Sequence, residues 1–208
     1  MISVLGRFEF EKCAEFLNLD IYNTNDQIQN YKIAIMNYTS RRYRDVNAGI
    51  RFGETHEKHI RAATLLTEAL LWLPIYNNDY VVRYSDLNPE YEEKIRIPGE
   101  EITEPGFTST SADPNFELDV PRNYKLIIKH CSGRYIADYS EHPHEQEVLI
   151  RAGATFIVES FDEETQTAYL TEKEKDSPDS ENSHVDINNL TQENIIADNA
   201  EALIGGEV

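Results

Sequence analysis

The sequence predicts one α+β domain in which helices come first and a mainly antiparallel sheet follows. In the first third of the chain, apolar residues recur at intervals of three and four, the period of a buried helical face. After Pro74 the pattern changes to short β-rich runs separated by Pro, Gly and Asp. The chain has 208 residues and a hydrophobic fraction of 40%, which suits one compact domain and is marginal for two. We therefore expect a single domain over residues 1–170, with its helical part at about 1–75.

Four segments carry the helical period. The strongest pattern covers residues 57–73 and is closed by Pro74, because a proline lacks the backbone donor that continues a helix. The other predicted helices cover residues 10–19, 25–38 and 43–52.

Strands are predicted where β-branched and aromatic residues cluster in the second half of the chain. These runs cover residues 80–84, 94–98, 124–129, 147–150, 155–161 and 167–170. Parallel strands need crossover connections, usually helices, and no such helices are visible between these runs. The pairing is therefore expected to be antiparallel.

Residues 171–208 differ in composition from the rest of the chain. They gain Asp, Glu, Asn and Ser, and Ser177-Pro178-Asp179-Ser180 interrupts any regular element. A weak amphipathic pattern covers residues 190–203. We expect an acidic tail that is either partly disordered or carries a short helix docked on the domain.

Charge and cysteine content exclude several classes of function. The formal net charge of −19 and the pI near 4.6 make the average surface repel nucleic acids and anionic membranes, so neither is expected as a partner. Cys13 and Cys131 lack the spacing of a zinc site, so no metal is expected, while one disulfide between them stays open. No signal peptide or membrane span is visible, which predicts cytoplasmic synthesis and leaves secretion or delivery into another cell open.

The motif Glu145-Gln146-Glu147 is the first that could carry chemistry. At the start of a strand, the period of two would place both carboxylates on one face, about 6–7 Å apart. Two like charges on one face cost free energy unless a cation or a function keeps them there. Alone the motif is weak, because a charged strand edge is its ordinary interpretation in an acidic protein.

Two further groups lie upstream. Residues 106–111 contain four consecutive hydroxyl side chains, which can hold a carboxylate or a ribose hydroxyl, although a Thr/Ser-rich strand or an N-cap near Asp113 is the ordinary interpretation. Arg83 lies within an apolar run, so it either points to solvent or is buried beside an anion such as a phosphate.

The order and spacing of these three groups resembles the arginine, Ser-Thr-Ser, Glu-x-Glu signature of ADP-ribosyltransferases. The bacterial toxin branch is most similar, namely the actin-modifying binary toxins and the Rho-modifying exoenzymes. Five upstream side chains resemble a helix of that branch: Tyr38, Thr39, Tyr43, Asn47 and Arg51. Residues 132–136 resemble its Gly-Ala-Tyr-Ile strand, and residues 147–156 resemble its closing hairpin. The resemblance covers roughly residues 38–160.

The resemblance implies two packed, mainly antiparallel sheets that form a cleft for NAD, the co-substrate, with no metal. The implied activity is transfer of ADP-ribose to a protein side chain with release of nicotinamide. Glu147 would stabilise the positive charge that develops on the ribose, with Ser109 steadying it. Glu145 would orient an acceptor arginine and take its proton. Relatives with Gln at the position of Glu145 modify Asn, so Glu here favours arginine.

The resemblance also implies contacts with NAD and with the target protein. The implied NAD contacts are Arg83, Tyr43, Asn47, Thr110 and Ser111. Arg83 would bind the phosphates, because a dinucleotide site in so acidic a chain needs cations of its own. Tyr139 would contact the target protein. His142 and His144 lie in the loop before Glu145 and are interpreted as loop residues.

Two departures from the family pattern favour an alternative function. Tyr84 follows Arg83 where many relatives have Gly or a second Arg, and Lys125 stands where an Arg often begins the central strand. A catalytically degenerate module of the same fold, which binds NAD or a protein, is therefore the main competitor. A third interpretation is an acidic interaction protein whose tail from Thr171 binds a basic partner. A monomer is favoured. The target protein and the setting, whether secreted effector, phage enzyme or toxin component, stay open.

Overall fold

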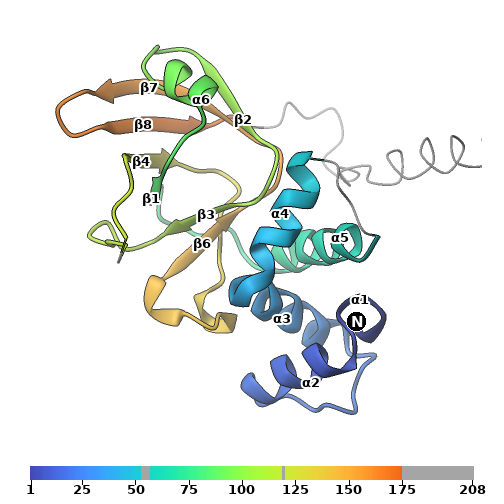
Figure 1. The fold of residues 1–208 in the computed structure, drawn as a ribbon. Helices are drawn as coiled ribbons and strands as arrows, with labels where there is room; N and C mark the ends of the chain where they lie inside the picture. Colours follow the sequence, from blue (N-terminus) through green and yellow to red (C-terminus); the bar gives the residue numbers. More distant parts are fainter. Residues whose placement is uncertain (53–56, 119, 175–208) are drawn as a thin grey trace, which may run out of the picture. The chain divides into compact units, whose positions relative to one another are not determined.

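The computed structural model describes residues 1–52, 57–118 and 120–174, and Met1–Glu174 form one compact unit. Helices occupy the first part of this unit and strands the second, as Figure 1 shows. The expectation for the acidic tail falls, apart from its first four residues, outside the described residues.

The helices agree closely with the segments predicted from the apolar period. Within the described residues the α-helices before the first strand are α1 (Ile2–Leu5), α2 (Arg7–Phe16), α3 (Gln27–Asn37), α4 (Tyr43–Phe52) and α5 (Glu57–Trp72). Helix α3 begins where the Asp26 carboxylate accepts a hydrogen bond from Gln29 N, an N-cap. Helix α5 ends shortly before Pro74, as expected.

A π-helical turn, η1 (Tyr38–Arg42), joins α3 to α4. π-Helical turns are rare and are concentrated at functional sites. The Thr39 hydroxyl donates to Met36 O over 3.1 Å and accepts a hydrogen bond from Glu141 N over 3.2 Å. The turn is thereby tied to the loop that precedes Glu145.

The strands form one mixed sheet of eight, in the order β2-β7-β8-β4-β1-β3-β6-β5. Their bounds are β1 (Tyr80–Ser85), β2 (Glu101–Glu104), β3 (Thr108–Ser111), β4 (Tyr124–Lys129), β5 (Arg134–Tyr135), β6 (Glu147–Ile150), β7 (Ala154–Asp162) and β8 (Thr167–Glu172). The shorter elements are α6 (Pro89–Lys94) and the 3₁₀ turns η2 (Ala137–Tyr139) and η3 (Pro143–Glu145).

The sheet corrects three expectations. Two packed sheets were expected, but β1 pairs with both β3 and β4, so that the strands form a single sheet. Strands β4 and β8 are parallel, and β5, β6 and β7 lie within the connection between them, where a helix had been thought necessary. No strand forms over 94–98: the Asn88 side chain caps α6 with Pro89 at its first position, so Lys94 ends a helix and the strand begins at Glu101.

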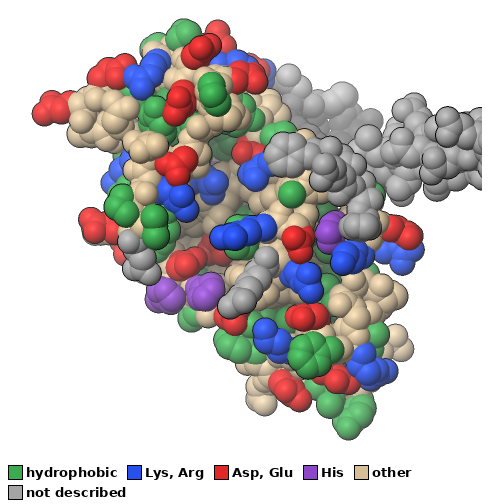
Figure 2. Space-filling view, viewed as in Figure 1, with side chains coloured by type: hydrophobic (Ala, Val, Ile, Leu, Met, Phe, Trp, Pro, Cys, Tyr) green, Lys and Arg blue, Asp and Glu red, His purple; other side chains and the backbone are tan. Residues whose placement is uncertain are grey.

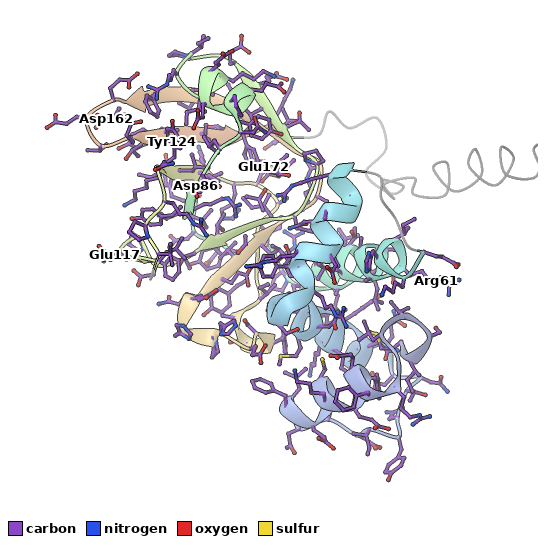
Figure 3. The ribbon with its side chains drawn as sticks, viewed as in Figure 1. Arg61, Asp86, Glu117, Tyr124, Asp162 and Glu172 are labelled. Atoms are coloured by element: carbon purple, nitrogen blue, oxygen red, sulfur yellow. The ribbon has the colours of Figure 1, made fainter. Side chains whose placement is uncertain are left out.

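The last strand continues beyond its predicted end at residue 170, because Thr171 and Glu172 pair with β7. Glu172, labelled in Figure 3, accepts hydrogen bonds from Cys131 N (2.8 Å), Ser132 N (2.9 Å) and the Ser132 hydroxyl (2.6 Å), and pairs with Arg151. These bonds hold the turn between β4 and β5 against β8. Cys131 and Cys13 are both free thiols, so the possible disulfide does not form.

Two apolar clusters position the site. One lies within the sheet around β1, β4, β7 and β8. The other joins α3, α4 and α5 to the sheet through Phe107, Ile136 and Leu149. Figure 1 shows the same helices beside β3 and β6. The Thr/Ser strand and the strand of Glu147 therefore lie where helices meet sheet.

Candidate active site

Glu147 is the first residue of β6 and is only 6% exposed. It lies opposite Ser111 of β3, which in turn lies opposite Val82 of β1. Burial raises the pKa of Glu147 to about 7, a hydrogen bond from the Ser109 side chain lowers it, and the nearby Glu145 carboxylate raises it. A buried carboxylate beside a hydroxyl and a second acid is the type of group that active sites use.

Glu145 does not lie on the strand, contrary to the strand geometry predicted for this motif. It ends the 3₁₀ turn η3, and Gln146 has a left-handed backbone with φ 47°. This left-handed residue breaks the alternation, so the shared face of a strand does not explain how the two acids meet. The Glu145 carboxylate nevertheless lies near enough to Glu147 to raise its pKa. A turn therefore brings together the pair that a strand was expected to align.

Arg83 lies between the two acids and a neighbouring cavity. It lies on β1, is partly buried, and its Nη1 donates to Ser109 O over 2.7 Å. Burial lowers the pKa of the Arg83 guanidinium, although the carboxylates of Glu104 and Glu147 act in the opposite direction.

A cavity of about 300 Å³ lies beside Arg83, and Figure 2 shows a hollow in this face with Lys and Arg side chains around it. Part of its lining is apolar or aromatic, while its polar lining residues are Arg51 of α4, Arg83, Ser85, Asp86, Asn88, Glu104 and Thr108. Glu145 and Glu147 do not line it. Arg83 is the link, since its guanidinium faces the cavity and bonds to the residue that supports Glu147.

The hydroxyl residues of β3 divide into two kinds. Thr110 Oγ1 donates to Val148 O over 2.6 Å, and Ser111 Oγ donates to Glu145 O over 2.8 Å. Both hydroxyls, which had been expected to bind NAD, therefore hold the backbone of the strand and turn that carry the two acids. Thr108 is 4% exposed, and its hydroxyl has no hydrogen-bond partner within the described part of the chain. Thr108 is one of the residues that line the cavity, although its hydroxyl oxygen is itself shielded from solvent.

Asn47 ties helix α4 to the segment before β3. Its Oδ1 accepts from Phe107 N over 2.9 Å, while its Nδ2 donates to Phe107 O over 3.3 Å and to the buried Tyr38 hydroxyl over 3.1 Å. Both amide hydrogens are thus engaged. Desolvation raises the pKa of Tyr38, and the nearby Glu147 also raises it. Tyr43, by contrast, is 40% exposed with its ring edge-on to Tyr38.

Tyr139 lies in η2 between helical side chains. Its ring centroid is 6.0 Å from that of Trp72, and Lys32 Nζ lies 5.6 Å from it. His142 and His144 follow in the same segment with ring centroids 6.0 Å apart. Tyr139 therefore belongs to the segment that leads to Glu145, at the surface where α3 and α5 meet it.

Three site residues had no role assigned from the sequence. Glu104 precedes the Phe-x-Ser-Thr-Ser pattern, while Tyr38 and Arg51 matched a family motif without an assigned role. Thr108 occupies the variable position of the pattern and was grouped with its hydroxyl residues. Only the spatial meeting of α4 with β2 and β3 reveals them. Tyr84 and Lys125, the two departures from the family pattern, lie opposite each other on β1 and β4, with Lys125 Nζ 5.5 Å from the Tyr84 ring centroid.

No group of His, Cys, Asp and Glu side chains that could hold a metal ion occurs in residues 1–52, 57–118 and 120–174. In the same residues no helix combines the length and the apolar character that crossing a membrane requires.

The family described as ADP-ribosyltransferase exoenzyme matches residues 17–192 of the sequence. The protein Mav of Mycobacterium avium (strain 104), named provisionally as an NAD(+)–arginine ADP-ribosyltransferase, is 35% identical over 136 residues, or 64% of this chain. The chain spans 16% of the length of that relative.

Solved structures of bacterial proteins share the fold. The type III effector XopAI from Xanthomonas axonopodis pv. citri has a TM-score of 0.61 at 21% identity, covering 80% of this chain and 76% of that one. The ADP-ribosyltransferase HopU1 of Pseudomonas syringae pv. tomato DC3000 has a TM-score of 0.60 at 17% identity, covering 80% and 96%. Exoenzyme S from Pseudomonas aeruginosa, solved with carba-NAD and a human 14-3-3 protein, has a TM-score of 0.61 at 16% identity, covering 86% of this chain and 96% of that one.

Proposed function

The chain belongs to the ADP-ribosyltransferase exoenzyme family, whose members use NAD, and from that premise we propose that it transfers ADP-ribose to an arginine side chain of a target protein. The observation that carries the proposal is the pair Glu145 and Glu147, with Glu147 buried against Ser109 and within the influence of Arg83. The relative Mav, provisionally named for transfer to arginine, supports the choice of acceptor.

Glu147 would act on the ribose. As the bond between nicotinamide and ribose breaks, its electron pair leaves with the neutral nicotinamide, and positive charge develops on the ribose. A fixed carboxylate in a water-poor site stabilises that charge strongly. With a pKa of about 7 before substrate binds, Glu147 is partly protonated at neutral pH. A cationic ribose would favour its ionised form.

Glu145 would act on the acceptor. A guanidinium is protonated at physiological pH and must lose a proton before its nitrogen can attack the ribose carbon. Glu145 is less buried than Glu147 and ends a turn, so it can reach a protein side chain that approaches from outside. It would orient the arginine and accept the proton as the new nitrogen–carbon bond forms, a role typically worth about 10²–10⁴-fold in rate.

The NAD diphosphate would lie in the cavity of Arg51 and Arg83. Arg51 and Arg83 there supply two guanidinium groups for a dianion. The two carboxylates of the lining, Glu104 and Asp86, are paired with Arg51 and with Arg122. Thr108 lines the same space, and a rotation of its side chain would bring its unpartnered hydroxyl to a phosphate or ribose oxygen. Asn47, Thr110 and Ser111 would support the site through the backbone bonds described above, whereas Tyr43 remains a candidate for contact with NAD.

Mass spectrometry tests the proposal. The protein is incubated with NAD and a guanidino acceptor such as agmatine or polyarginine, and the products are analysed for ADP-ribose on a guanidine nitrogen. We expect the arginine-type adduct together with free nicotinamide. Nicotinamide release with adducts only on other residue types would contradict arginine as the acceptor.

The same experiment decides the alternative of a catalytically degenerate module. Its support is the pair Tyr84 and Lys125, but these side chains contact each other across β1 and β4. Binding of NAD without nicotinamide release and without any adduct would establish the degenerate module instead.

A further inference from the structure

We propose that Glu104 is a positioning residue, which holds the Arg51 guanidinium in the orientation in which it and Arg83 receive the NAD diphosphate. The inference rests on the function proposed above and adds a carboxylate to the machinery of a site that binds an anion. The juxtaposition that suggests it is Arg51, Glu104 and Arg83 on one wall of the cavity.

The hydrogen bonds of Glu104 fix both the acid and its partner. Glu104 Oε1 accepts from Arg51 Nε over 2.8 Å and from Gly106 N over 2.9 Å. Because a backbone N–H holds the carboxylate in place, the carboxylate sets the position of the arginine and not the reverse. Within the described residues this is the one side-chain hydrogen bond of Arg51, and it uses Nε, which leaves both terminal nitrogens for a ligand.

The backbone around Gly106 makes this contact possible. A Cβ at Gly106 would lie 2.9 Å from Asn47 Oδ1 and 3.3 Å from Arg51 Nε, so a larger residue would push helix α4 away. With glycine at this position, Asn47 forms hydrogen bonds with the Phe107 backbone, and Arg51 donates a hydrogen bond to Glu104. One turn of α4 is therefore docked on the segment between β2 and β3 through both side chains.

Charge gives a second reason for an acid at this position. Arg51 lowers the pKa of the Arg83 guanidinium by repulsion, and Glu104 is the carboxylate that acts most strongly in the opposite direction. Glu104 thus keeps two like charges together before the substrate binds. A diphosphate, with two negative charges, can then meet a preformed pair of cations instead of assembling it.

A purely structural ion pair between α4 and β2 is the competing explanation, and kinetics with NAD separates the two. Glu104→Ala should raise the KM for NAD in the hydrolysis reaction by about tenfold, the usual size for loss of one charge-assisted contact, with kcat little changed. Glu104→Gln keeps an acceptor for Arg51 Nε but loses the negative charge, so its KM should recover only in part, to about threefold above that of the unsubstituted protein.

Two further variants sharpen the test. In an Arg51→Ala background, Glu104→Ala should have no additional effect on KM, because the acid acts through that arginine. Glu101→Ala, which removes an exposed carboxylate from the same strand with its 2.8 Å ion pair to Lys173, is the matched control and should leave KM unchanged. Glu104→Asp, which withdraws the carboxylate by one methylene, should give an intermediate KM and replaces the Ala variant if that one fails to fold.

An unchanged KM in Glu104→Ala, or additive effects of Glu104→Ala and Arg51→Ala, would overturn the inference, as would a Gln variant as impaired as Ala. Failure of the proposed function looks different, because the unsubstituted protein itself would then release no nicotinamide from NAD.

Discussion

Replacing Glu147 with Gln should stabilise the folded protein at alkaline pH and abolish the proposed transferase activity. Glu147 is buried, and its pKa rises from 4.5 to about 7 on folding, chiefly because burial disfavours the charged form. The folded protein therefore holds this proton more tightly than the unfolded chain does. The contribution of Glu147 to the free energy of unfolding must then fall as pH rises through the window from about 4.5 to about 7, and level off above it.

The size of the effect follows from the same values. One pKa unit corresponds to about 1.4 kcal/mol, so the rise from 4.5 to about 7 corresponds to about 3 kcal/mol of stability lost when Glu147 ionises. Glutamine is close in shape, can accept the hydrogen bond from Ser109, and does not ionise. Glu147→Gln should therefore exceed the unsubstituted protein in stability by up to about 3 kcal/mol at about pH 8.5, and by much less at about pH 4.5.

Urea unfolding at several pH values measures this difference, with Glu117→Gln as the matched control. Glu117, labelled in Figure 3, is a solvated carboxylate in the segment between β3 and β4, so its replacement should change stability little at either pH. If the gain from Glu147→Gln were the same at both ends of the pH range, the buried, proton-holding state of Glu147 would be refuted.

Two other substitutions test the support of the site. Asn47→Ala leaves the buried Phe107 N–H and C=O without the hydrogen bonds of the Asn47 side chain. It should lower the free energy of unfolding, measured with urea, by about 2–4 kcal/mol. A loss below about 0.5 kcal/mol would contradict the role of Asn47 in holding α4 to this segment. Thr108→Val removes a buried hydroxyl that has no hydrogen-bond partner in the described residues, so the unbound protein should be as stable as the unsubstituted one or more stable. Calorimetry should show weaker binding of NAD to the variant. An unchanged affinity would mean that NAD binds elsewhere.

The sequence predicted the local elements well because local signals specify them. Helix α4 and strands β4 and β6 have the predicted bounds, since apolar period and turn residues act over a few positions. Strand β8 extends beyond residue 170 because its last residues pair with β7, and no local pattern reveals that pairing.

Tertiary arrangement accounts for the expectations that were wrong. The sheet is single because β1 pairs on both of its edges, which depends on contacts between distant segments. The acids of the Glu-x-Glu motif meet through a turn because Gln146 adopts a left-handed backbone, a conformation that Gln shows rarely and that its sequence context does not signal. The two-residue spacing therefore drew attention to two acids that do lie close together, but the geometry predicted for them was wrong.

The candidate site was predictable as a set of motifs and less so as a set of contacts. Arg83, Ser109, Glu145 and Glu147 meet as the resemblance implied. The hydroxyls of Thr110 and Ser111 donate to backbone carbonyls of Val148 and Glu145, and these contacts depend on which strand lies opposite. Glu104 escaped notice because its bond to Arg51 joins residues that are 53 positions apart in the sequence, which no local pattern reveals.

The different roles proposed for Glu145 and Glu147 are tested most directly by measuring nicotinamide release and adduct formation on agmatine in parallel. We predict that Glu147→Gln abolishes both, and that Glu145→Gln abolishes the adduct while nicotinamide release continues. Full adduct formation by either variant would contradict the account.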